Sequence, residues 1–322
     1  MEVINPRSDL QNVPITVCII TYKHEKYIAQ AIESVLSQKT NFPFHIVIAD
    51  DCSPDGTREI IRNYANRYPD RITLLLQQTN KGAGWNFHNL IDYPNSPFIA
   101  YMEGDDYWIS DEKLQIQYDT ISADSTLSVV YADSYRLLNG EFVEFYEFKR
   151  PLKHAIGLKE FLLHGANTIP SCTALIRKPV IEEFLKIWVK IEDQLFHGDF
   201  LLWCIAGKLG DLKFIDQKFG VYRVHQNGIM RSTPNVRTLT SGLFLNHFLV
   251  DYLGPAYKRH FLAGDWWYHL EIAFLAIQEK QWLRSIAFLL RSLISATRYG
   301  QGRQIQILRD YLYRVRNRRV IN

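Results

Sequence analysis

Three acidic residues follow directly on an apolar segment that is typical of a buried strand. The segment Phe98–Met102 is apolar, and Glu103, Asp105 and Asp106 come next, with Gly104 after the first of them. A strand interior does not tolerate three acids, so they must lie at its end, beside solvent or a ligand. Carboxylate oxygens there suit Mg²⁺ or Mn²⁺, and a metal held by one or two carboxylates usually also holds substrate phosphates. A solvated acidic turn is the alternative.

The elements that must position these acids can be read from the first hundred residues. Short apolar segments alternate there with segments whose apolar residues recur at helical spacing. Strands are expected at 15–21, 44–49, 72–76 and 98–102, with a helix in each interval. This alternation predicts an α/β fold with a parallel, doubly wound sheet, in which ligands bind beyond the carboxyl ends of the strands.

Polar residues follow three of these strands, namely Thr21-Tyr22, Asp50-Asp51 and Glu103 with Asp105. Three polar clusters at one edge of a sheet indicate a site more strongly than any one of them. A dinucleotide site would need G-x-G-x-x-G directly after the first strand, and that turn here is Thr-Tyr-Lys-His-Glu-Lys. The fold is therefore Rossmann-like, but the nucleotide is not held in the usual dinucleotide manner.

Composition adds little about chemistry but excludes several classes of protein. The net charge of +3 over 322 residues does not by itself indicate a nucleic-acid partner, and none is expected. The four cysteines are widely spaced and form no C-x-x-C pair, which favours reduced thiols in a cytoplasmic protein. The polar N-terminus predicts no signal peptide, and no apolar run approaches the roughly 20 residues of a membrane span.

Four motifs, in order and spacing, resemble the family 2 glycosyltransferases with the GT-A fold, the inverting enzymes of bacterial cell-surface polysaccharide synthesis. They are Thr21-Tyr22, the segment 49–57 (Ala-Asp-Asp-Cys-Ser-Pro-Asp-Gly-Thr), Asn80-x-Gly82-x-x-x-Asn86 and the segment 103–108 (Glu-Gly-Asp-Asp-Tyr-Trp). The resemblance covers roughly residues 13 to 230. It implies transfer of a sugar from a nucleotide-sugar donor with inversion at the anomeric carbon.

The resemblance assigns a nucleotide-sugar site to the first half of the chain. Tyr22 resembles the aromatic residue that stacks on the base, and Asp51 the acid that hydrogen-bonds the base or ribose, while Asp50 braces the loop. Asp105 resembles the metal ligand, and Glu103, where relatives usually carry Asp, lines the ribose and metal side. The full set implied for the nucleotide sugar is Thr21, Tyr22, Glu25, Asp51, Asn80, Gly82, Asn86, Glu103 and Asp105. Turn and cap chemistry remains the alternative for Asn80, Gly82 and Asn86.

Two motifs in the second half complete the implied site. Asp199 begins an apolar segment and resembles the general base, in a pair that is often Glu-Asp and is Gly-Asp here; capping a helix is the alternative. His225, in a Tyr-Arg-x-His element, resembles a residue that ligates the metal or contacts the diphosphate. The segment 167–177 resembles the part of the family that lies under the transferred sugar.

A helical extension is expected after the catalytic domain. We divide the chain into a GT-A domain at 1–232 and a helical part at 233–322, because apolar residues from Leu243 to Val315 recur at helical spacing. Its last part is basic, with Arg284, Arg291 and Arg298 followed by six more arginines. These helices are expected to pack on the catalytic domain or on a second subunit in a homodimer. Peripheral contact with an anionic membrane is the alternative.

Together these features predict a metal-dependent, inverting glycosyltransferase that uses Mn²⁺ or Mg²⁺. The expected donor is a UDP-sugar, the expected acceptor a hydroxyl of a glycan or lipid-linked saccharide, and the expected location the cytoplasm or the inner face of the membrane. A nucleotidyltransferase would need a glycine- and arginine-rich loop after the first strand, which is missing. A non-catalytic protein that binds nucleotide sugars or glycans on the same fold remains open, because Glu103 and Gly198 depart from the family pattern.

Overall fold

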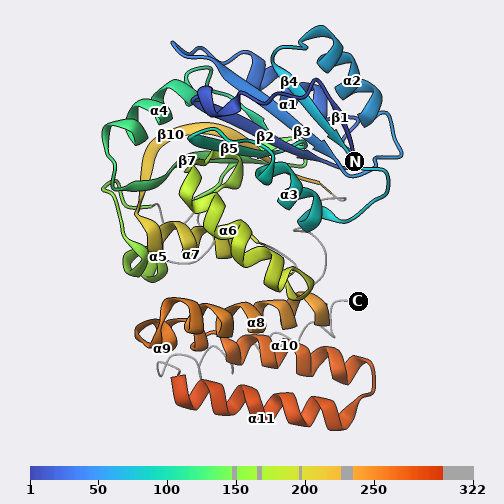
Figure 1. Cartoon of the computed structure of the whole chain (residues 1–322). Coiled ribbons are helices and arrows are strands. Elements are labelled where there is room, and N and C mark those ends of the chain that lie inside the picture. Colours follow the sequence, from blue (N-terminus) through green and yellow to red (C-terminus); the bar gives the residue numbers. More distant parts are fainter. Residues whose placement is uncertain (147–150, 165–168, 196–197, 226–234, 300–322) are drawn as a thin grey trace. The chain divides into compact units, whose positions relative to one another are not determined.

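The computed structural model describes residues 1–146, 151–164, 169–195, 198–225 and 235–299 (Figure 1). The chain divides into two compact units, which are described separately. The first comprises Met1–Glu192 and His197–Ser232, and the second comprises Asp193–Phe196 and Thr233–Asn322.

One mixed sheet of ten strands, counted over the described residues, forms the centre of the first unit. Its order is β1-β4-β3-β2-β5-β9-β7-β10-β6, and β8 pairs with β7. The strands are β1 (Glu2–Ile4), β2 (Ile15–Thr21), β3 (Phe44–Asp50), β4 (Ile72–Leu76), β5 (Phe98–Glu103), β6 (Tyr107–Trp108), β7 (Leu127–Leu138), β8 (Glu141–Glu144), β9 (Leu175–Arg177) and β10 (Asp211–Val224).

The sheet is parallel where the sequence predicts it and mixed beyond that point. The neighbours β4, β3, β2 and β5 run parallel, as the βα alternation predicts. Short β9 then pairs antiparallel with both β5 and β7, and β10 runs parallel to β7. β7 extends over twelve residues, because β10 provides a partner along its whole length.

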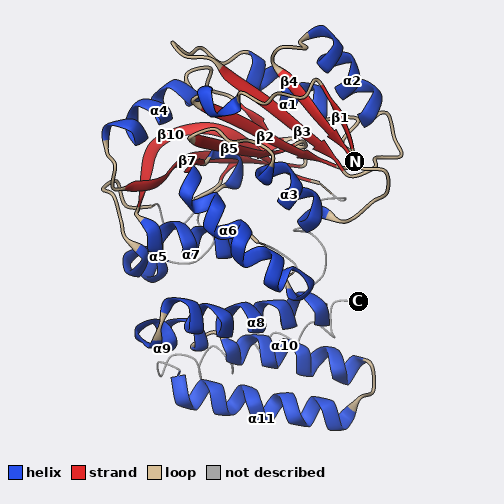
Figure 2. Cartoon of the chain, in the orientation of Figure 1, coloured by secondary structure: helices blue, strands red, loops and turns tan. Residues whose placement is uncertain are grey.

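Helices cover both faces of this sheet (Figure 2). They are α1 (Ile28–Leu36), α2 (Thr57–Arg67), α3 (Ala83–Asp92), α4 (Lys113–Ala123), α5 (Leu158–His164), α6 (Lys178–Ile191) and α7 (Asp199–Leu209), with short 3₁₀ turns at Leu10–Asn12, Ser171–Thr173 and Glu192–Gln194. α1 packs on α2, whereas α3 packs on α6 and α6 on α7. β2 and β3 are therefore covered on both sides, which explains their continuous apolar sequences.

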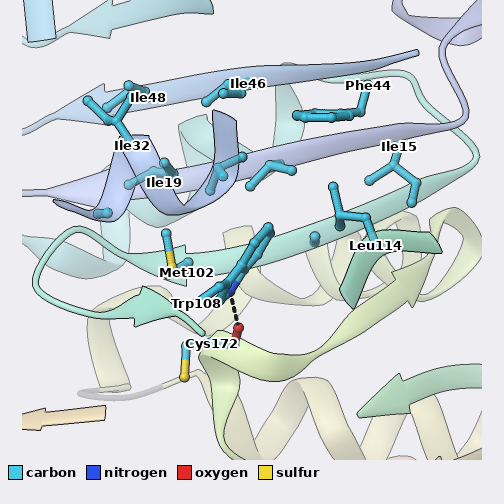
Figure 3. Close-up of a cluster of buried hydrophobic side chains, with 14 of the residues drawn as sticks. Ile15, Ile19, Ile32, Phe44, Ile46, Ile48, Met102, Trp108, Leu114 and Cys172 are labelled. Atoms are coloured by element: carbon cyan, nitrogen blue, oxygen red, sulfur yellow. Dashed lines mark hydrogen bonds between the residues drawn. The ribbon is translucent and has the colours of Figure 1, made fainter. Parts of the chain in front are cut away.

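The core between the sheet and α1 holds isoleucines from β2 and β3 and the indole of Trp108 (Figure 3). The Trp108 Nε1–H donates to the Cys172 carbonyl oxygen at 2.7 Å, which ties the turn after β5 to the segment before β9. Lys113, the first residue of α4, is also fully buried, and its ammonium lies 4.0 Å from the Trp108 ring centroid. The contacts of Trp108 with Cys172 and Lys113 thus hold the segment that follows β5 against the core.

The second unit is helical in its described part. It contains α8 (Val236–Leu253), a 3₁₀ turn at Pro255–Tyr257, α9 (Lys258–Leu262), α10 (Asp265–Gln278) and α11 (Trp282–Tyr299). α8 and α10 approach closely at Gly242, where a β-carbon would lie 2.4 Å from the Tyr268 ring. Within the described residues, we find no helix with the length and apolarity needed to cross a bilayer.

Candidate functional site

The predicted polar clusters meet at one edge of the parallel sheet. Thr21 at the end of β2 lies beside Asp50 at the end of β3, and Ile20 lies beside Glu103 at the end of β5. The chain turns sharply after Glu103, and the Gly104 N–H donates to the Ile20 carbonyl oxygen at 2.8 Å. A β-carbon at Gly104 would lie 2.9 Å from Ile28, so this turn requires glycine. Asp105 is thereby presented at the edge where ligands bind in such sheets.

Asp105 is held between two histidines. Its Oδ2 lies 2.9 Å from His225 Nε2, directly after β10, and 3.6 Å from His24 Nε2, in the loop after β2. Burial opposes ionisation of Asp105, but the His225 hydrogen bond and the charges of both histidines outweigh it and hold its pKa below the ordinary value. Asp105 is therefore a carboxylate at neutral pH, with imidazole nitrogens beside it.

Arg223 fastens the end of β10 to the acidic turn. Its backbone N–H donates to Asp106 Oδ1 at 2.9 Å, and its guanidinium donates to the Asp105 carbonyl oxygen. The guanidinium also lies over the Tyr107 ring, 4.5 Å from its centroid, and over the Tyr27 ring at 5.0 Å. These contacts position His225, two residues further along, against Asp105.

Asp106 is the inner acid of the turn. It is 1% exposed, and its Oδ2 has no hydrogen-bond partner among the described residues. Burial, with Asp105 and Glu103 nearby, raises the pKa of Asp106 well above its ordinary value. In the structure, Asp106 accepts the Arg223 backbone N–H.

Glu103 differs from Asp105 in protonation, although the two are separated by one residue. Burial, together with the negative charges of Asp105 and Asp199, raises the pKa of Glu103 to about 8. The Ser171 hydroxyl donates to its carboxyl oxygens at 3.1 and 3.3 Å. The two acids therefore have pKa values on opposite sides of neutrality, which is how adjacent carboxyl groups take different roles.

The loop after β2 carries the residues expected at the nucleotide base. Tyr22 is 36% exposed, and the Lys23 ammonium lies 5.0 Å from its ring centroid. The Lys23 N–H donates to Ser53 Oγ at 3.0 Å, which fixes the loop against the segment after β3. Glu25 Oε2 accepts the Gly56 N–H at 3.2 Å, just before α2 begins. Tyr22 thus presents a ring to solvent, whereas Glu25 braces the start of α2.

The Asp51 carboxylate is hydrogen-bonded to the backbone of the glycine loop. Its two carboxylate oxygens accept the N–H groups of Lys81 and Gly82 at 2.7 and 2.8 Å. Gly82 has φ of +92°, a conformation that favours glycine. Asn86 is fully buried, and its side-chain amide donates to the Ala49 carbonyl oxygen at 3.0 Å. Asp51 and Asn86 therefore shape the loop in which Asn80 remains exposed.

Asp50 braces the same region from within, as expected. Its carboxylate is fully buried and accepts hydrogen bonds from the Ser53 hydroxyl and backbone and from Arg58 Nε at 2.5 Å. The Arg58 guanidinium also donates to the Gln77 carbonyl oxygen. Arg58 thus bridges the ends of β3 and β4 with its side chain, in addition to the backbone pairing of the two strands.

Asp199 is the first residue of α7 and is exposed. Gly198 occupies the N-cap, and no side chain caps this helix, so Asp199 is not engaged as a cap. Its charge nevertheless contributes to the raised pKa values of Glu103 and Tyr101. Asp199 therefore lies close enough to the β5 tip for its negative charge to affect Glu103, and its own carboxylate is exposed to solvent.

An aromatic wall stands behind Asp199. Trp188 on α6 stacks on Phe184 with ring centroids 5.3 Å apart, and Phe184 contacts Phe87 at 5.8 Å. A β-carbon at Gly198 would lie 2.8 Å from the Trp188 ring, and one at Gly84 would lie 2.9 Å from it. The glycine before Asp199 is thus required by the indole packed against it.

Two residues at the site escape prediction from sequence, namely His24, which lies beside Asp105, and Trp188, which packs under Gly198. Ser171, which holds Glu103, falls within the segment 167–177 that was expected to lie under the transferred sugar. His24 lies in the loop between two predicted elements, and only its position next to Glu25 could have indicated that it belongs to the site. Of the segments singled out above, Asn167 and Thr168 lie outside the described residues, as do the arginines beyond residue 299.

The donor set at Asp105 suits a divalent cation only in part. One carboxylate and one imidazole are ligands that Mn²⁺ or Mg²⁺ accepts. Among the described residues, no three His, Cys, Asp or Glu side chains are arranged to hold an ion by themselves. The residues therefore fit a metal whose remaining ligands come from the diphosphate of a substrate and from water.

Comparison with known proteins agrees with this architecture. Residues 16–185 match the model of glycosyl transferase family 2. The uncharacterised protein Rv1520 of Mycobacterium tuberculosis is 29% identical over 218 residues, which cover 68% of this chain and only 61% of Rv1520. The dTDP-rhamnosyl transferase RfbG of Shigella flexneri is 26% identical over 268 residues, covering 80% of this chain and 82% of RfbG.

A solved structure shows the same fold. Residues 1–349 of TarS from S. aureus, in complex with UDP-GlcNAc, superpose with a TM-score of 0.63 at 18% identity, covering 86% of this chain and 81% of that one. This likeness shows that the chain has the GT-A fold. Because the family model spans more than half of the sequence, the chain belongs to the family 2 glycosyltransferases.

Proposed function

We propose that this chain is a metal-dependent, inverting glycosyltransferase that moves a sugar from a nucleotide-diphosphate sugar to a hydroxyl of a glycan or lipid-linked saccharide. The observation that carries the proposal is the geometry at the β5 tip, where Asp105 Oδ2 lies 2.9 Å from His225 Nε2 at the edge at which Thr21 and Asp50 also end their strands. The His225 hydrogen bond outweighs the effect of burial and holds the pKa of Asp105 below its ordinary value. The activity is assigned to the unit of residues 1–192 and 197–232.

The donor is proposed to be a UDP-sugar, bound along the edge of β2, β3 and β5. Tyr22 offers an exposed ring for the base, and Asp51 holds the Lys81–Gly82 backbone in the shape that flanks it. TarS, whose structure holds UDP-GlcNAc, supports this choice, and RfbG makes dTDP the second nucleotide to test. Uracil and thymine present the same hydrogen-bonding edge, so the present contacts suit either.

The metal is proposed to bind at Asp105 and His225. When bound, it would neutralise charge that builds on the departing diphosphate. Arg223 holds both ligands in register, because it bonds the Asp105 carbonyl oxygen and precedes His225 by two residues. His24 Nε2 lies 3.6 Å from Asp105 on the side of the β2 loop. The protein thus supplies two ligands in fixed relation and leaves the rest to the substrate.

Asp199 is proposed as the general base. It removes the proton from the acceptor hydroxyl as that oxygen forms its bond to the anomeric carbon, and the bond from this carbon to the diphosphate oxygen breaks on the opposite face. Asp199 is the first residue of α7, and its exposed carboxylate is accessible to an acceptor hydroxyl. Glu103, held by the Ser171 hydroxyl, is proposed to line the sugar and ribose side of the donor.

The test is calorimetric titration of UDP, with Mn²⁺ and with EDTA, into the wild-type chain and into Asp105→Ala. We expect metal-dependent binding in the wild type that Asp105→Ala abolishes. The matched control is Asp119→Ala, which removes an exposed acid on α4 and is expected to bind as the wild type does. dTDP and GDP titrations follow if UDP does not bind, and failure of all three overturns the donor assignment.

Donor turnover separates the enzyme from a binding protein of the same fold. We expect UDP release from UDP-sugars in the presence of Mn²⁺ and its loss with EDTA. A chain that binds UDP tightly but releases none from any donor, with or without saccharide acceptors, would be a nucleotide-sugar-binding protein. That outcome would leave the site in place and remove the catalytic role of Asp199.

A further inference from the structure

The helix α11 of the second unit has two faces of opposite character. Ser285, Ser292 and Ser295 are 2%, 3% and 7% exposed and form its inward face. Ser292 Oγ donates to the Trp266 carbonyl oxygen at 2.8 Å, and Ser295 Oγ donates to the Leu262 carbonyl oxygen at 3.3 Å. These bonds to α10 and α9 fix the rotation of α11 about its axis. A helix that packs through small polar residues must turn its other residues outward.

The outward face is made of large apolar side chains. Six of them are 54–86% exposed, namely Trp282, Leu283, Ile286, Leu290, Leu293 and Ile294. At 3.6 residues per turn, their positions form one continuous stripe from Trp282 to Ile294, along somewhat more than the first three turns of the helix. Isolated exposed apolar residues are ordinary in proteins, but a contiguous face of this length marks an interaction surface.

The charges beside this stripe indicate what it meets. Arg284, Arg291 and Arg298 are all exposed and recur every seven residues, so they line one edge of the apolar stripe. The 18 residues of α11 include no Asp or Glu. A partner that covers the stripe must therefore be apolar in its interior and anionic at its surface.

A second copy of α11 does not meet these requirements. Helices that pair with their own copies carry charges of both signs beside the apolar seam, and a second α11 would bring only more arginines. A bilayer with anionic lipids provides an acyl layer for the leucines and phosphate groups for the arginines. Trp282 and Tyr299 at the two ends of the helix are the residue types found at the boundary of membrane and water.

We propose that α11 lies flat on an anionic lipid bilayer, with its apolar stripe among the acyl chains and its arginine row at the headgroups. The helix does not span the bilayer, since its serine face remains packed on α9 and α10. This attachment is independent of the chemistry at Asp105 and Asp199, so it can be tested without any sugar or nucleotide.

Flotation of the full chain on density gradients tests the proposal. Two vesicle types are used, phosphatidylcholine alone and phosphatidylcholine mixed with phosphatidylglycerol. We expect the wild type to float with the mixed vesicles at low salt and to be released at high salt, because the arginine contacts are screened. Leu290→Gln should weaken binding about tenfold, the loss expected when one leucine is no longer buried. Arg291→Gln should weaken the dependence on phosphatidylglycerol.

The control is Val189→Gln on α6, which is 56% exposed, the same as Leu290. It should float as the wild type does. Wild type that fails to float, or that floats equally with both vesicle types, overturns the proposal. So does a Leu290→Gln variant that converts a dimer to a monomer in the absence of lipid, since the stripe would then bind a second copy. A lowered melting temperature in Leu290→Gln would also overturn it, because the stripe would then be covered within the chain.

Discussion

Lys113 gives the folded chain a stability that rises with pH. The side chain is fully buried, donates to Gln117 Oε1 at 2.6 Å and lies over the Trp108 ring. Burial lowers the pKa of Lys113 from its ordinary 10.5 to about 7. Since one pKa unit corresponds to about 1.4 kcal/mol, keeping the charged form in this site costs about 5 kcal/mol relative to the neutral amine.

The sign follows from counting protons. Between pH 7 and 10.5, the unfolded chain binds a proton on Lys113 that the folded chain has mostly released. The free energy of unfolding therefore rises with pH across this range. From pH 7 to pH 9, the contribution of Lys113 should increase by about 2 kcal/mol. Glu103, with its raised pKa of about 8, acts in the opposite direction, so Lys113 must be isolated by difference.

The assay is urea unfolding of the wild type and of Lys113→Met at pH 7, 8 and 9 and at constant ionic strength. The free energy of unfolding of the wild type should gain about 2 kcal/mol relative to Lys113→Met over this range. Lys39→Met is the control, because its ammonium is exposed and its partner Asp111 lies at the surface. Its difference from the wild type should not change. A difference between wild type and Lys113→Met that is constant in pH would refute the reasoning.

Two further predictions concern the site and its support. Asp199→Asn should lower donor turnover by about 10²- to 10⁴-fold while UDP binding by calorimetry stays within twofold, because the base acts only on the acceptor; near wild-type turnover would exclude Asp199 from that role. Arg58→Ala should lower the free energy of unfolding by about 3–5 kcal/mol in urea, since it leaves the buried Asp50 unpaired. Arg62→Ala, which breaks an exposed pair with Glu2, should lower the free energy of unfolding far less than Arg58→Ala does, and equal losses would contradict this account.

The parts of the fold that sequence predicts are those set by local periodicity. The strands β2 to β5 and the acids at their ends follow from apolar runs that stop at polar residues, and the structure confirms their shared edge. The antiparallel insertion of β9 between β5 and β7 could not be predicted, because a strand of three residues carries no periodic signal. Its position depends on partners far away in the chain.

The candidate site also has features that the sequence predicts and features that it does not. The acids at the β5 tip could be identified from their types and spacing, but their opposite pKa shifts could not. Burial and the charges of Asp105 and Asp199 raise the pKa of Glu103, whereas His225 and His24, from other segments, lower that of Asp105 against the effect of burial. Asp51 was expected to face the nucleotide, and the structure shows that it also clamps the glycine loop through two backbone N–H groups. That role depends on where a loop 30 residues away folds back.

The packing of Trp188 also bears on how this chain can change through evolution. Gly198 stands where relatives often carry an acid, and the Trp188 indole occupies the space that such a side chain would need. Restoring the acid by a single substitution would drive it into the ring, so Trp188 would have to become smaller first. Gly84 on α3 packs against the same indole. Replacing Trp188 by a smaller residue would therefore leave a void beneath two segments of the site at once. Trp188, Gly84 and Gly198 are therefore coupled by packing, so a larger residue at either glycine requires a smaller side chain at position 188 first.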